Sequence, residues 1–428
     1  MGTASASGLH FGARAGEDYI DPLTLLGPGR GRAKLVDDDE SKPLDEVVER
    51  RRLIDGLPSG RQIYDWARAQ AEAKFRSKIS MATAVLDSVY DIWIPLPVYL
   101  AAAAVQWERD QAICTPESTP VPTAAEIGSD RIALLVGGLA SETGDAAVLD
   151  VDVETLGYAP ENVHQFSYRD DGRPYDAEDT QGDLDAAGER LATRLAELQR
   201  RHPGARIDVI AHSQGGLVAR SAVTRHGARP TTLVTLATPH DGTELASMAA
   251  GVDGTRSGHL ALQAVGSQRP GGIDPNSTSV LQMAEGSPFL VDLRRNGRWP
   301  PAGITHAVSI GAHGDPIVPS RHAHLQGALN TVVTPFGTPS LNDHDKLPGS
   351  PEATREIARA LARQGPTCRS LRQTLFDDLA SIELSDTQDR MVLAVTASAL
   401  YADKKLKLPP ERAAIAKVKE VGGRLVRR

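Results

Sequence analysis

The sequence predicts an α/β protein built on a mostly parallel sheet with helices on both faces. Its short apolar runs lack the strict alternation of strands that face water on one side, so we expect strands buried on both faces. Helical patterns separate these runs, and such alternation of strand and helix is typical of a parallel sheet. The runs are IALLVGG (132–138), VHQFSY (163–168), IDVIAHS (207–213), TLVTLATP (232–239) and THAVSIGA (305–312).

Three regions follow one another along the 428 residues. Residues 1–128 are first Gly-rich and charged, then helical over 61–94, and they end in a Pro-rich linker. Residues 129–365 hold the alternating strands and helices, with the clearest helical pattern at 179–200. Residues 366–428 read as a helical tail that becomes basic.

The composition is that of an ordinary globular protein, with 40% hydrophobic and 24% charged residues. The 47 basic and 55 acidic side chains give a net charge of −8, which lacks the basic footprint of a nucleic-acid-binding protein. Only two cysteines are present, too few for a disulfide-built scaffold or a multi-cysteine zinc site. No cluster of His, Cys and Asp has ligand spacing in the sequence, so we expect no metal and no cofactor.

The N-terminal residues lack a basic start followed by an apolar run, so no secretory signal is expected and a cytoplasmic location is favoured. The longest apolar stretch, 92–105, has 14 residues and contains two prolines. A membrane span needs about 20 apolar residues. Peripheral membrane contact through this stretch or through the basic tail stays open. Without a secretory signal, Cys114 and Cys368 are expected to be free thiols.

A nucleophile is indicated by IDVIAHSQGGLVARSAV (207–223). The strand ends at Ala211, Ser213 follows on a tight turn, and Gly215 and Gly216 open a helix. A sharp strand-to-helix turn exposes a serine, and the residues two before and two after it must be small. The helix N-terminus directs its positive end at the developing oxyanion. The alternative is that the glycines only pack a helix.

A second element for the oxyanion is expected in the loop after the first strand of this region. Gly137 and Gly138 stand there, and paired glycines let backbone N–H groups approach a substrate closely. We expect the backbone N–H groups of Leu139 and Gln214 to form the oxyanion hole. The alternative is an ordinary glycine turn.

With these motifs the chain resembles the α/β-hydrolase superfamily, in its serine lipase and esterase branch. That branch includes triacylglycerol lipases, lecithin–cholesterol acyltransferase-type enzymes and inositol-glycolipid deacylases. The resemblance covers residues 129–365 and rests on LLVGGLAS, VIAHSQGGLVAR, LATPHDGTELA, VSIGAHGDPIVP and LNDHDKLPG. Two departures are Ala211, where the family has a first Gly, and Gly137-Gly138, where lipases often have His-Gly.

The resemblance implies a triad in the order Ser, acid, His. Asp315 follows the strand at 305–312 and fits the acid, with Asp241 as runner-up. His344 lies before a predicted helix and fits the base. The other candidate bases stand in less suitable places along the chain: His212, His240, His322 and His324.

The segment 243–300 is longer than a connection between two core strands needs. In lipases an insertion here forms a cap over the acyl pocket, and SVLQMAEGSPFLVDL (279–293) resembles lipase sequences. The expected pocket lining is Leu260, Val280, Met283, Phe289 and Leu290. The alternative is that these side chains pack only on the core.

The sequence therefore predicts a serine hydrolase of carboxylic esters, with a lipid-like acyl substrate favoured by the apolar cap. Ser213, Asp315 and His344 would act through an acyl-enzyme. One alternative uses the same triad to transfer the acyl group to an alcohol. Another is a non-catalytic member of the fold that binds a ligand or a partner.

Overall fold

The computed structural model divides the chain into two units, Met1–Ala102 with Val426–Arg428, and Ala103–Leu425. In the first unit, β1 (Ala13–Ala15) pairs antiparallel with β2 (Asp18–Ile20). The residues that the structure describes are 13–15, 18–20, 104–105, 107–128, 130–169, 173–253, 272–295, 306–340, 342–378, 380–381, 384–385 and 388. The predicted helix at 61–94, most of the apolar stretch 92–105 and the basic tail lie outside them.

The second unit is built on a six-stranded sheet in the order β4-β3-β5-β6-β7-β8. All neighbouring strands are parallel. The strands are β3 (Arg131–Val136), β4 (Val163–Gln165), β5 (Arg206–His212), β6 (Thr232–Leu236), β7 (His306–Ala312) and β8 (Leu329–Val333). The predicted α/β-hydrolase fold is confirmed.

β8 is a strand that the sequence analysis missed. It lies at the edge of the sheet, and most of its residues are only partly buried. Its sequence, LNTVV, includes two polar residues and so lacks the continuous apolar run of the central strands.

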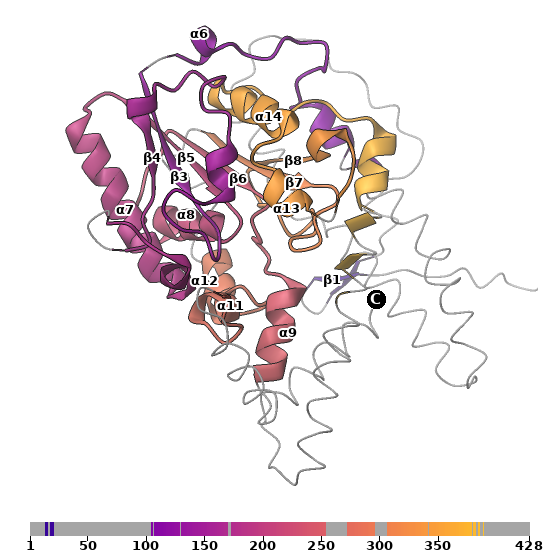
Figure 1. Ribbon diagram of the computed structural model, residues 1–428. Helices are drawn as coiled ribbons and strands as arrows, with labels where there is room; N and C mark the ends of the chain where they lie inside the picture. Colours follow the sequence, from indigo (N-terminus) through magenta and orange to yellow (C-terminus); the bar gives the residue numbers. More distant parts are fainter. Residues whose placement is uncertain are drawn as a thin grey trace, which may run out of the picture. The chain divides into compact units, whose positions relative to one another are not determined.

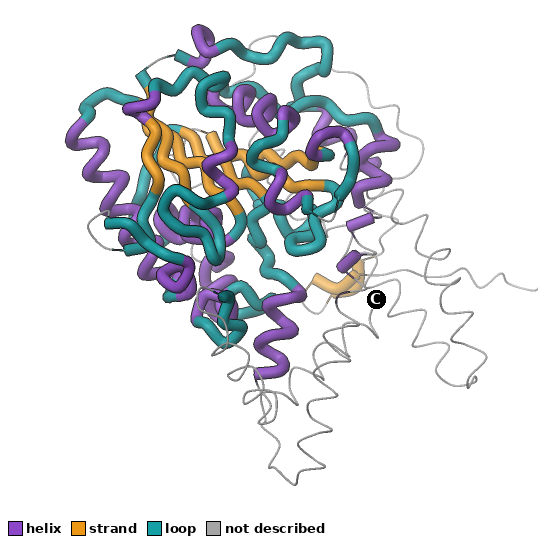
Figure 2. The backbone as a smooth tube through the Cα atoms, in the orientation of Figure 1, coloured by secondary structure: helices purple, strands orange, loops and turns teal. Residues whose placement is uncertain are grey.

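Helices cover both faces of the sheet (Figure 1). Ile132, Leu134 and Val136 of β3 belong to a core cluster with the helices α7 (Leu184–Arg201) and α8 (Gln214–Thr224). The alternate residues of the same strand belong to a second cluster with α14 (Pro351–Leu361). Figure 2 shows the strands sandwiched between these layers. Successive side chains of a strand point to opposite faces, so each face has its own core.

The segment between β6 and β7 carries α9 (Glu244–Asp253), α11 (Thr278–Gln282) and α12 (Pro288–Arg295), which gather at one end of the domain (Figure 1). Of the residues expected to line an acyl pocket, Leu260 lies outside the described residues. The other four, Val280, Met283, Phe289 and Leu290, are buried in the core cluster of α7 and α8. They pack on the core here, and their part in acyl binding stays a prediction.

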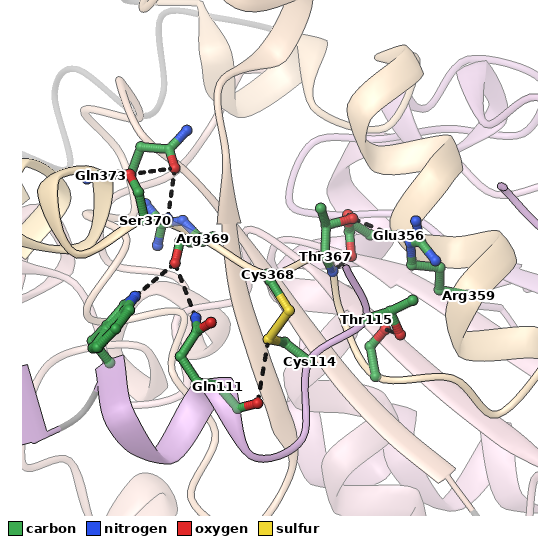
Figure 3. The surroundings of a disulfide bond; sticks show 12 residues. Gln111, Cys114, Thr115, Glu356, Arg359, Thr367, Cys368, Arg369, Ser370 and Gln373 are labelled. Carbon is green, nitrogen blue, oxygen red and sulfur yellow. Dashed lines mark hydrogen bonds between the residues drawn. A yellow bond between two sulfur atoms is a disulfide. The ribbon is translucent and has the colours of Figure 1, made fainter. Parts of the chain in front are cut away.

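Cys114 and Cys368 form a disulfide (Figure 3), so the prediction of two free thiols is wrong. Their segments run side by side. The Thr115 N–H donates to the Pro366 carbonyl at 2.7 Å, and the Cys368 N–H donates to the Thr115 carbonyl at 2.8 Å. The cysteines are 254 residues apart in sequence, and the pairing of these two segments brings them together.

No helix among the described residues has the length and apolar character required to cross a membrane.

Candidate active site

The turn after β5 holds Ser213 in a conformation that side chains rarely adopt, with φ 54° and ψ −130°. Its N–H donates to the Leu236 carbonyl at 2.8 Å, which fixes the turn against β6. A Cβ atom on Gly215 would lie 2.5 Å from the Gly137 carbonyl oxygen, and one on Gly216 would collide with Thr238. These contacts explain why glycines follow the serine.

Ser213, His344 and Asp315 form one continuous chain of hydrogen bonds. The Ser213 hydroxyl lies 2.9 Å from His344 Nε2, and His344 Nδ1 lies 2.7 Å from Asp315 Oδ2. The other oxygen of Asp315 accepts from the N–H groups of Ile317 and Val318 at 2.8 and 2.9 Å. Both carboxylate oxygens therefore have donors, which holds the carboxylate oriented toward the imidazole.

Three separate elements supply these side chains. Ser213 is the N-cap of α8, Asp315 follows β7, and His344 lies on the short helix α13 (Asp343–Lys346). β5 and β7 are parallel strands of one sheet, so their carboxyl ends meet at the same edge. That edge is where ligands bind in open α/β sheets.

His344 and Asp315 are both buried. Burial lowers the pKa of His344, but the Asp315 carboxylate and its hydrogen bond outweigh burial and raise the pKa above its ordinary value. A raised pKa makes the imidazole a stronger acceptor for the proton of a serine hydroxyl.

The loop after β3 lies directly against the serine. A Cβ atom on Gly138 would lie 2.8 Å from Ser213 Cβ. Neither Leu139 N–H nor Gln214 N–H donates to any described residue, so both are free to bind an oxyanion. Ala140 has φ 61°, which shows how tightly this loop turns.

Thr180 ties this loop to α8. Its hydroxyl accepts from the Ala140 N–H at 2.9 Å, and its carbonyl accepts from the side-chain amide of Gln214 at 2.7 Å. The Tyr168 hydroxyl donates to the Gly137 carbonyl at 2.7 Å. The two proposed oxyanion donors therefore stand on segments that are cross-linked to one another.

His212 supports His344, a role that the sequence analysis did not identify. Its Nε2 lies 2.9 Å from the His344 carbonyl oxygen, and the two ring centroids are 4.8 Å apart. Burial, and then the neighbouring His344, lower the pKa of His212 to about 3. The ring is neutral near pH 7, so we assign its Nε2–H as the donor to this carbonyl. In the sequence, the one indication of this role is that His212 directly precedes Ser213.

The competing residues have other partners. Asp241 is half exposed and lies 3.5 Å from Arg294. His240 Nε2 lies 3.0 Å from the Thr235 hydroxyl. His322 faces Glu244 and Glu285. His324 makes no hydrogen bond to Ser213.

Glu244, Glu285 and His322 form the one group of described residues that could hold a metal ion, with their ligand atoms within 4.8 Å of one another. The sequence shows no such cluster, because these residues stand far apart in the chain.

Residues 127–257 match the family described as "Putative serine esterase (DUF676)". This match and the observed fold confirm the resemblance to α/β-hydrolases of the lipase and esterase kind, and they support a hydrolase of that kind. No curated protein sequence matches the chain.

Several solved structures are similar in fold. The lipase BlEst2 of Bacillus licheniformis in its propeptide form has 16% identity and a TM-score of 0.41 over 60% of this chain and 54% of that one. Phospholipase PlaB of Legionella pneumophila has 13% identity and a TM-score of 0.40 over 61% of this chain and 64% of that one. A lipase-esterase related protein of Clostridium acetobutylicum has 13% identity and a TM-score of 0.34 over 55% and 93%. The chain thus spans about half of the Bacillus protein and under two thirds of the Legionella protein.

Proposed function

We propose that this chain hydrolyses carboxylic esters through Ser213, His344 and Asp315. The observation that carries the proposal is the continuous hydrogen-bond chain from the Ser213 hydroxyl through both ring nitrogens of His344 to Asp315. A serine hydroxyl is a weak nucleophile unless an adjacent base accepts its proton, and the base needs a third group to orient it. These three side chains supply those parts.

In the first half of the reaction, Ser213 Oγ attacks the ester carbonyl while His344 Nε2 takes its proton. The N–H groups of Leu139 and Gln214 would receive the negative charge on the carbonyl oxygen. His344 then returns the proton to the leaving alcohol, and an acyl-serine remains. Asp315 stabilises the imidazolium throughout without taking a proton itself.

In the second half, water attacks the acyl-serine with His344 again as base. The same donors stabilise the second oxyanion, and Ser213 is regenerated. We favour a lipid-like acyl group because the insertion between β6 and β7 is rich in apolar side chains. Neither step calls on a metal ion.

The test is hydrolysis of p-nitrophenyl esters over a series of acyl lengths, by wild type, Ser213→Ala and the matched control Ser221→Ala. Ser221 is a buried serine of α8 whose hydroxyl donates to Asp185, away from the triad. We expect loss of Ser213 to lower kcat by several powers of ten, because the triad acts as a unit. Ser221→Ala should retain activity.

Labelling with a fluorophosphonate probe separates a narrow substrate range from an inactive site. A wild type that is inert on every ester but labelled at Ser213 would still be a serine hydrolase. A folded wild type that neither reacts with esters nor takes the label would refute the proposal, as would full activity in Ser213→Ala.

A further inference from the structure

A second buried group of ionisable side chains lies at the junction between the insertion and the core. Glu244 is the first residue of α9, Glu285 stands in the turn before α12, and His322 lies in the loop after β7. Their exposed fractions are 0%, 9% and 2%. Two carboxylates that are buried away from water need a compensating positive charge nearby.

The hydrogen bonding of His322 turns one ring nitrogen toward this group. Nδ1 lies 2.9 Å from the Gly242 carbonyl oxygen, which can only accept, so we assign the proton to Nδ1. In the neutral ring, Nε2 then carries a lone pair, and it lies 3.1 Å from Glu244 Oε1 and 3.4 Å from the Ser385 hydroxyl. Glu285 Oε1 lies 3.7 Å from Nδ1 of the same ring. Two acceptors as close as Nε2 and Glu244 Oε1 repel each other unless a proton or a cation lies between them. A ring N–H fixed by a carbonyl is the usual arrangement of a metal-binding histidine.

Glu244 gives an independent indication that this group can bind a cation. Its Oε2 is buried without a hydrogen-bond partner among the described residues. Its Oε1 accepts from the Ser385 hydroxyl and lies 3.7 Å from Arg321 Nη2. The group therefore has a buried carboxylate oxygen that no described residue uses.

We propose that Glu244, Glu285 and His322 bind a Zn²⁺ ion. Zinc takes imidazole nitrogen together with carboxylate oxygen, whereas Ca²⁺ and Mg²⁺ prefer oxygen ligands alone. The ion would join the start of α9 and the turn before α12 to the loop after β7. It would thus fasten the insertion to the core. The proposal does not depend on ester hydrolysis, because its readout is zinc binding.

The competing arrangement has no metal: a protonated His322 would form an ion pair with Glu244 across the same 3.1 Å contact. This arrangement and the zinc site predict opposite results when Zn²⁺ is added to metal-free protein.

The experiment uses the full, untagged chain, stripped with EDTA, dialysed and checked for folding by circular dichroism. Titration calorimetry with ZnCl₂ then compares wild type, Glu285→Gln, His322→Gln and the matched control Glu356→Gln. Glu356 is another buried glutamate, whose carboxylate accepts from the Thr367 N–H on the far side of the sheet. Glu285 is the least buried of the three ligands, so its variant is the most certain to fold.

We expect wild type and Glu356→Gln to bind about one Zn²⁺ per chain. Glu285→Gln and His322→Gln should bind it about tenfold more weakly or worse. A folded wild type that takes up no zinc would overturn the proposal in favour of the protonated pair. Equal affinity in wild type and in Glu285→Gln would overturn it by placing the ion elsewhere.

Discussion

Two buried histidines of this protein, His344 and His322, each face a carboxylate, but their hydrogen bonds run in opposite senses. His344 directs Nδ1 to Asp315, which leaves Nε2 to accept from the Ser213 hydroxyl. His322 directs Nδ1 to a backbone carbonyl and turns Nε2 toward the carboxylate of Glu244. In the first arrangement a donor faces every acceptor, which suits transfer of a proton. In the second an acceptor faces an acceptor, which suits a cation.

The carboxylates of Asp315 and Glu244 also differ in their hydrogen bonding. Both oxygens of Asp315 are hydrogen-bonded, one to His344 and one to two backbone N–H groups. One oxygen of Glu244 has no partner among the described residues. A carboxylate that is fully satisfied by protein donors orients a neighbour, whereas one with an unused buried oxygen can still bind a cation.

Of the substitutions that distinguish the two histidine groups, Asp315→Asn is expected to have the largest effect. The amide cannot stabilise the imidazolium and favours the wrong tautomer of His344, so kcat should fall on the order of 10⁴-fold. Steady-state kinetics on the preferred p-nitrophenyl ester measures it. The control is Asp241→Asn, because Asp241 was the runner-up acid and lies half exposed beside Arg294. A large loss in the control but not in Asp315→Asn would reverse the assignment.

The second effect concerns His212, which we regard as a positioning residue for His344. In His212→Ala the buried His344 carbonyl loses its donor, and the base shifts relative to Ser213. A displacement of this kind lowers kcat by about 10- to 100-fold, with KM nearly unchanged. The midpoint of the pH profile should move as well.

His240→Asn is the matched control for that variant, since His240 is equally buried but contacts Thr235. A variant that loses stability without any change in kcat or in the pH profile would show that His212 serves only the core.

The pH dependence is a third test of the His344–Asp315 pair. Asp315 raises the pKa of His344 even though burial opposes it. Protonated His344 cannot take the serine proton, so kcat/KM should fall about tenfold per pH unit below that pKa. The midpoint is expected above the ordinary histidine value of about 6.5. A midpoint well below that value would contradict the raised pKa.

The raised pKa of His344 also makes stability depend on pH. This contribution to stability falls with rising pH, whereas activity rises. A raised pKa in the folded state means that the folded protein binds the proton more tightly than the unfolded chain does. This contribution to the free energy of unfolding is complete below the unfolded pKa and is lost as pH rises through the folded one.

The sequence predicted the parts of the site that depend on local pattern. Ser213 stands between a strand and a helix that are both visible as patterns, and its small neighbours follow from the tight turn. The central strands are apolar on both faces, so they stand out, whereas the half-exposed edge strand β8 does not. Asp315 and His344 were assigned by their order in a resembling family and not by local pattern.

The sequence could not predict contacts between residues that are far apart in the chain and come close only in the folded protein. The His212 contact joins its ring to a carbonyl 132 residues away. The Cys114–Cys368 bond needs two segments 254 residues apart to run side by side. The proposed zinc ligands come from three separate loops and helix ends, so no spacing in the sequence marks them.

The smallest expected effect is a rise in thermal stability when Zn²⁺ binds the group that includes His322. Zinc that binds only the folded state stabilises it by about 2.7 kcal/mol when its free concentration is 100 times Kd. For the unit Ala103–Leu425, that corresponds to a rise in Tm of roughly 4 °C. Differential scanning calorimetry of the stripped protein, with and without ZnCl₂, measures the shift. In Glu285→Gln the shift should shrink, whereas in Asp315→Asn it should persist, because the triad and the zinc group use different histidines. Loss of the shift in Asp315→Asn would mean that the two groups are coupled and form one network.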